Sequence, residues 1–132
     1  MSLDIMARAI REEELFEEFY EKAAMRTGNA AAKTLFLRLA DEERQHKLKL
    51  MGLHINVEAG PIGDDLALTP LNELQTIKDV FHHAITFEKK ARQKYLRFAR
   101  AFSEARELFT WLADEERKHE QLLTAELKRA GV

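Results

Sequence analysis

The sequence predicts an all-α protein of four long helices. Apolar residues recur at helical spacing along most of the 132 residues, without an alternating pattern long enough for a β-strand. Residues that interrupt helices are concentrated in one stretch, because three of the five glycines and both prolines fall between residues 52 and 70. The parts before and after this stretch repeat each other, which indicates two helical hairpins joined by a long connection.

The elements follow from the positions of these interruptions and from capping signals. The expected segments are a helix over 3–25, a break over 26–29, a helix over about 30–53, a connection over 54–69, and helices over about 70–101 and 103–130. Thr69 followed by Pro70 resembles an N-cap with proline at the first helical position, and Ser103 is the expected cap of the last helix. We therefore predict one domain over 1–132.

Composition excludes several classes of function. The 21 basic and 23 acidic residues give a net charge of −2, which argues against a nucleic-acid binder or a polybasic membrane module. No uncharged run exceeds eight residues, too few for a transmembrane helix. Asp4 and Arg8 stand where a signal peptide would be apolar, so a cytoplasmic location is expected. Cysteine is absent, so any metal must be held by carboxylates and imidazoles.

The two hairpins are copies of one unit. Residues 35–50 align with residues 108–123 at an offset of 73, and ten of the sixteen positions are identical. The helices that precede them align at an offset of 75. The matching residues are Ala9, Ile10, Glu13, Tyr20 and Ala24 in the first copy and Ala84, Ile85, Glu88, Tyr95 and Ala99 in the second.

Each copy places a Glu and a His on the apolar face of its second helix. Glu43 is preceded by Phe36 at seven residues and by Leu39 at four. It is followed by His46 at three residues and by Leu50 at seven. These spacings share one face of an α-helix. The second copy repeats them with Phe109, Leu112, Glu116, His119 and Leu123.

Glu13 and Glu88 are framed by apolar residues in the same way, each with a tyrosine seven residues later. Folding would therefore bury four carboxylates and two imidazoles at one level of the core. Ionised carboxylates cost on the order of several kcal/mol each when buried without compensation. Either they are protonated in a polar network without metal, or cations neutralise them. Oxygen and nitrogen ligands without sulfur suit iron or manganese, with zinc possible.

These motifs carry a family resemblance. The arrangement resembles the di-iron site of the ferritin-like superfamily, in which two helices supply one Glu each and the other two supply a Glu-x-x-His pair each. Within that superfamily, two motifs resemble those of the rubrerythrin family. They are Ala-Ile-x-x-Glu followed by Tyr seven residues after the Glu, and Leu-Ala-Asp-Glu-Glu-Arg-x-His. The resemblance implies a ferritin-like four-helix bundle in which residues 54–69 cross its length. A 23-residue helix is about 35 Å long, and 16 extended residues span up to about 53 Å, so the crossover is feasible.

The resemblance implies a role for each matched residue. Glu43 and Glu116 would bridge two iron ions, Glu13 and Glu88 would be terminal ligands, and His46 and His119 would bind one ion each. Tyr20 and Tyr95 would donate hydrogen bonds to ligand carboxylates, although they could equally be ordinary core residues. Glu42 and Glu115 could orient the histidines. We expect His54, His82 and His83 to have surface or incidental roles, and most of the acidic residues around Glu13 to face solvent.

The chain departs from the usual rubrerythrin pattern in two ways. Rubrerythrins usually carry a further carboxylate three residues after the ligand Glu of the third helix, and Ala91 stands there. Glu17 could substitute, but we expect it to be exposed. The second departure is the lack of the four cysteines that a rubredoxin domain needs.

The resemblance implies a di-iron oxidoreductase that reduces hydrogen peroxide or O2. Its electrons would come from an external carrier, such as a rubredoxin-like or flavin protein, or from Fe(II) as in a ferroxidase. The alternative is a non-catalytic bundle that binds or buffers iron or zinc. We also expect a homodimer, with exchange of hairpins between chains as one option.

Overall fold

The computed structural model describes residues 3–52, 71, 74 and 76–131, and over these residues it contains helices and turns without strands. The elements are α1 (Leu3–Arg26), α2 (Ala30–Met51), α3 (Ile77–Ala101), the short 3-10 helix η3 (Ser103–Ala105) and α4 (Arg106–Ala130). The all-α prediction is confirmed.

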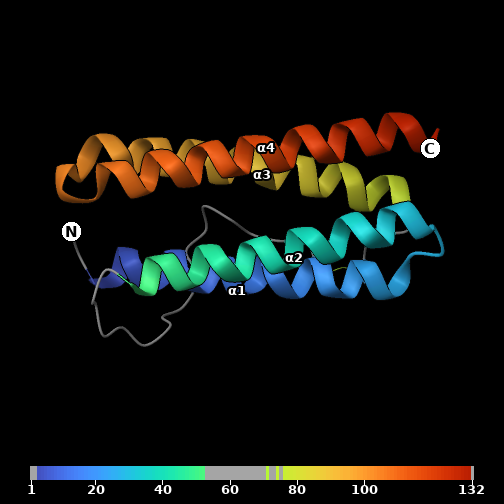
Figure 1. Cartoon of the computed structure of the whole chain (residues 1–132), viewed down its shortest axis with the longest axis horizontal. Coiled ribbons are helices and arrows are strands. Elements are labelled where there is room, and N and C mark those ends of the chain that lie inside the picture. Colours follow the sequence, from blue (N-terminus) through green and yellow to red (C-terminus); the bar gives the residue numbers. More distant parts are fainter. Residues whose placement is uncertain (1–2, 53–70, 72–73, 75, 132) are drawn as a thin grey trace. The chain divides into compact units, whose positions relative to one another are not determined.

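The helices form two compact units, and each is a helical hairpin. The first unit contains α1 and α2, which run side by side in opposite directions, and the second contains α3 and α4 in the same arrangement (Figure 1). In the part of the chain that the structure describes, none of the helices is apolar over a length that could cross a membrane.

The break between α1 and α2 lies where the sequence predicts it. Asn29 adopts an extended backbone and its side chain accepts a hydrogen bond from the backbone N–H of Ala32, at 2.9 Å. This bond satisfies one of the N–H groups that have no partner in the first turn of a helix. At the other end α2 stops at Met51, and the backbone N–H of Gly52 donates to the carbonyl oxygen of Leu48, at 3.0 Å.

The predicted start of the third helix is displaced. Leu74 is not helical and α3 begins at Ile77, whereas Thr69 and Pro70 lie outside the described residues. The cap is Thr76, whose side chain accepts from the backbone N–H of Asp79 while the Asp79 carboxylate accepts from the N–H of Thr76. This reciprocal capping box satisfies two backbone donors at once. It marks the start of α3, which the sequence alone predicts at Thr69 and Pro70.

Ser103 is not the cap of α4. It begins η3, in which the backbone N–H of Ala105 donates to the carbonyl oxygen of Phe102 at 3.1 Å, and α4 starts at Arg106. No side chain caps the start of α4. The tight 3-10 turn supplies backbone hydrogen bonds there instead.

Matched aromatic contacts hold the two helices of each hairpin together. The rings of Tyr20 and Phe36 are stacked with their centroids 6.1 Å apart, and the equivalent rings of Tyr95 and Phe109 are stacked at 6.0 Å. All four side chains are fully buried. The repeat in sequence is therefore also a repeat in packing.

Candidate metal centre

The structure buries all six predicted ligand residues. No one of them exposes more than 1% of its surface, although carboxylates and imidazoles normally face solvent. They are Glu13 on α1, Glu43 and His46 on α2, Glu88 on α3, and Glu116 and His119 on α4.

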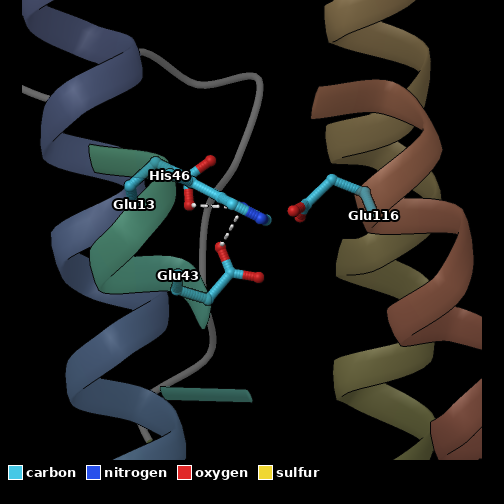
Figure 2. A group of neighbouring side chains, drawn as sticks. All are labelled: Glu13, Glu43, His46 and Glu116. Carbon is cyan, nitrogen blue, oxygen red and sulfur yellow. Dashed lines mark ion pairs between the residues drawn. The ribbon is translucent and has the colours of Figure 1, made fainter. Parts of the chain in front are cut away.

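In the first hairpin, three of these side chains point toward one another (Figure 2). The Nδ1 atom of His46 lies 3.6 Å from Oε2 of Glu13 and 3.6 Å from Oε2 of Glu43. One possible ligand atom from each residue lies within 4.8 Å of those of the other two. Glu13 and the α2 pair come from different helices, so the cluster depends on the packing of the hairpin.

The second hairpin repeats this cluster with the equivalent residues. The Nδ1 atom of His119 lies 3.0 Å from Oε2 of Glu88 and 3.9 Å from Oε1 of Glu116. These three residues also offer ligand atoms within 4.8 Å of one another. Each hairpin therefore contains the same group of two carboxylates and one imidazole.

The helix period explains why these polar groups are buried. Glu43 and His46 are three residues apart, so both project from the face of α2 that carries the apolar side chains. Phe36, Leu39 and Leu50 on that face have no exposed surface. Burying these large apolar side chains stabilises the fold by about 1.5–3 kcal/mol each, which offsets the cost of taking the carboxylates out of water.

The donor set of each cluster fits a divalent metal ion. Two ionised carboxylates carry two negative charges and a neutral imidazole adds none, so one divalent cation would neutralise the charge of the cluster in each hairpin. Oxygen and nitrogen donors without sulfur are the ligands of non-haem iron and of manganese, and zinc also accepts them. The distances of 3.0–3.9 Å between ligand atoms match the spacing expected for atoms that coordinate one ion.

Both tyrosines lie among aromatic rings of their own hairpin. Tyr20 also contacts Phe16 and Phe19, at centroid distances of 6.4 and 5.7 Å. The amino group of Lys94 lies 4.4 Å from the centre of the Tyr95 ring, which is the geometry of a cation–π interaction. The core position of the tyrosines is established, and donation by their hydroxyls to ligand carboxylates stays a prediction.

The acidic residues of α1 differ in their exposure. Glu18 and Glu21 are exposed, as expected for a mostly solvated run, whereas Glu12 is only 4% exposed. The side chain of Glu17 is 18% exposed and pairs with Lys47 on α2, with Nζ and Oε1 3.7 Å apart. The aliphatic part of a charged side chain can be covered by its neighbours, and the spacing of apolar residues does not reveal this.

The pair of Glu17 and Lys47 has a counterpart with exchanged charges. Arg92 on α3 occupies the position equivalent to Glu17, and Glu120 on α4 the position equivalent to Lys47. Nη1 of Arg92 lies 3.3 Å from Oε2 of Glu120. In both hairpins an ion pair thus joins the two helices one turn beyond the ligand Glu. In the sequence, this pair is visible only as opposite charges at aligned positions of the two repeats, and not as identical residues.

The residues next to the ligand glutamates have local partners. Glu42 pairs with Arg38 at 3.5 Å and Glu115 pairs with Lys118 at 3.1 Å, each on its own helix. Their proposed role in orienting the histidines stays a prediction.

The other histidines lie outside the two clusters. His82 is exposed, and His54 lies outside the described residues. The ring of His83 contacts that of Phe87 edge-on, at 4.4 Å between centroids. Burial, aided by the positive charge of Lys90, lowers the pKa of His83 below its usual 6.5.

Comparison with known proteins connects this arrangement to one family. The rubrerythrin family model matches residues 1–54 and 79–131. The chain belongs to the rubrerythrin family. Both matched segments include a complete cluster of two glutamates and one histidine, so the family match covers every predicted ligand.

Two solved structures resemble this rubrerythrin-family chain along nearly its whole length. A hypothetical protein from Pyrococcus furiosus is 29% identical, with a TM-score of 0.77 over 97% of this chain and 89% of that protein. A Thermotoga maritima protein, proposed to be a ferritin-like diiron-carboxylate protein, is 27% identical, with a TM-score of 0.79 over 100% of this chain and 97% of its own. The predicted ferritin-like four-helix fold is confirmed. Among curated proteins we found no match.

The buried carboxylates predict an unusual effect on stability. In the metal-free protein at pH 7, Glu43→Gln should raise the free energy of unfolding by about 1–2 kcal/mol. The substitution keeps the shape of the side chain and leaves one carboxylate beside His46 instead of two. Urea unfolding followed by circular dichroism measures the change.

Glu42→Gln is the matched control, because Glu42 is adjacent in sequence but its side chain is 29% exposed. It should change the stability by less than about 0.5 kcal/mol. If Glu43→Gln instead lowers the free energy of unfolding by as much as the control or more, the buried Glu43 carboxylate does not destabilise the metal-free protein.

Proposed function

We propose that this rubrerythrin-family protein is a di-iron oxidoreductase that reduces hydrogen peroxide or O2. The observation that carries the proposal is the duplicated cluster: each hairpin buries two carboxylates and one histidine with their ligand atoms within 4.8 Å. Family membership and the likeness to a protein proposed to be a diiron-carboxylate protein support it.

In this proposal the two clusters together hold two ions. Glu43 and Glu116 would bridge the ions, while Glu13 and Glu88 would be terminal ligands. His46 and His119 would each hold one ion, and in each ring Nδ1 is the nitrogen that faces glutamates of its own hairpin. Four carboxylates balance two divalent cations, so the loaded site is neutral. Neutrality removes most of the cost of burying the glutamates.

When bound, two ferrous ions supply the two electrons that reduce one molecule of hydrogen peroxide, with two protons, to two molecules of water. The chain's own residues prepare the site for this. Phe36, Leu39 and their repeat equivalents keep bulk water away. The hydroxyls of Tyr20 and Tyr95 would donate hydrogen bonds that hold ligand carboxylates in place.

Ala91 makes this site different from that of the usual rubrerythrin. It is fully buried, and its methyl group offers no ligand atom where a further carboxylate is usual. Each ion therefore keeps the ligands of its own hairpin and the shared bridges. We propose a symmetric site in which neither ion changes ligands during the reaction.

The 132 residues contain no cysteine and hence no rubredoxin centre, so we propose that a separate electron source restores the electrons. An external carrier such as a rubredoxin-like or flavin protein would give a peroxidase. Fe(II) as the substrate would give a ferroxidase. We propose that either reaction takes place in the cytoplasm.

Metal analysis tests the ligand assignment. Protein purified without oxygen and loaded with Fe(II) should bind two ions per chain, and Glu43→Ala or Glu116→Ala should each reduce this to one or none, because a bridging ligand serves both ions. Asp41→Ala and Asp114→Ala, at equivalent exposed positions of α2 and α4, are the controls and should retain two. Retention of two irons with unchanged affinity in Glu43→Ala would refute the assignment.

Peroxide titration tests the reaction. One equivalent of hydrogen peroxide should oxidise both ferrous ions in the loaded protein, with a change in absorbance that saturates at one equivalent. Turnover with a reduced carrier would then favour the peroxidase, and oxidation of excess Fe(II) would favour the ferroxidase. Binding of two ions without oxidation by peroxide or O2 would instead support the non-catalytic iron- or zinc-binding bundle.

A further inference from the structure

A second apolar stripe runs along the exposed side of α2. Leu37, Leu48 and Met51 are 49%, 57% and 50% exposed. Asp41 and Arg44 lie between them on the same face, because the positions follow one another at steps of four, three, four and three residues. These five residues are called the α2 stripe below.

The stripe is specific to the first hairpin. The positions of α4 equivalent to its three apolar residues hold Thr110, Gln121 and Thr124, which are also exposed. The charged pair in the middle is present in both repeats, as Asp114 and Arg117 in α4. At these three positions α2 is apolar where α4 is polar, and the exposed apolar residue of α4, Trp111, stands at the position equivalent to Arg38.

The α2 stripe is self-complementary. It is symmetric about the point midway between Asp41 and Arg44, so an antiparallel copy of α2 would place Leu37 against Leu48 and Asp41 against Arg44. Each apolar side chain would meet an apolar one, and each charge would meet its opposite, twice about a two-fold axis. Asp41 and Arg44 pair with each other on α2, with Oδ1 and Nη2 2.5 Å apart, but their side chains remain 48% and 56% exposed and so can also face a partner.

We propose that α2 is the dimerisation helix of this protein and that its stripe pairs with the stripe of a second copy. The steps of four and three residues are those of an antiparallel coiled-coil seam. The same symmetry places Met51 against Thr34, which is exposed, so the contact extends along α2 for about 25 Å. This inference is independent of the proposed function, because no ligand residue belongs to the stripe.

Replacing the stripe leucines by the residues of α4 tests the surface. Full-length Leu37→Thr/Leu48→Gln should weaken dimerisation at least about 100-fold in sedimentation velocity, because four leucine side chains leave the interface. Leu96→Gln, an exposed leucine of α3, is the control and should leave the dimer constant unchanged. Unchanged circular dichroism would show that the variants fold.

Charge exchange tests the antiparallel register. Asp41→Arg alone and Arg44→Asp alone should each be monomeric at concentrations where the parent chain dimerises, because like charges then face one another. An equimolar mixture of the two variants should form a heterodimer, in which every Arg faces an Asp.

Cysteine cross-linking gives a second readout, since the chain has no cysteine of its own. Oxidation of mixed Leu37→Cys and Leu48→Cys chains should give disulfide-linked dimers, whereas either chain alone should give few. A parent chain that stays monomeric at millimolar concentration would overturn the proposal. A dimer insensitive to the stripe substitutions, as expected if hairpins are exchanged between chains, would also overturn it.

Discussion

The cost of burying carboxylates is the constraint on which this structure depends. Each hairpin encloses two glutamates and a histidine that are almost wholly removed from water. An apolar core of the same volume would be more stable without them. Their presence in both copies, at matched positions and with His Nδ1 facing glutamate oxygens, therefore indicates a purpose other than stability. A metal site explains both the residue types and their duplication.

The helix period made the fold and the clusters predictable from sequence. Glu43 and His46 share a face with Phe36, Leu39 and Leu50, and the repeat identifies the equivalent residues around Glu116. What sequence reasoning misplaced depends on contacts that spacing does not reveal. The start of α3 follows from a reciprocal bond between Thr76 and Asp79, and Ser103 begins a 3-10 turn instead of capping α4.

Differences between the copies are as informative as their identities. Each hairpin has an ion pair that joins its two helices at equivalent positions, but the charges are exchanged between the copies. The pairs are Glu17 with Lys47 in the first hairpin and Arg92 with Glu120 in the second. Identity between the two copies does not reveal such pairs, because the charges are exchanged. The α2 stripe is a difference of another kind, since only one copy carries it. The repeat thus provides an equivalent cluster in each hairpin, together with an exposed apolar face on α2 alone.

X-ray absorption at the iron edge of the Fe-loaded protein tests the central claim most directly. The account predicts a first shell of oxygen and nitrogen atoms without sulfur, and a second iron at about 3.5–4 Å, the spacing of two-metal sites. Glu116→Ala should remove the iron–iron signal, whereas Asp114→Ala, at an exposed position of the same helix, should retain it. An isolated iron without a neighbouring metal in the fully loaded parent protein would contradict the account.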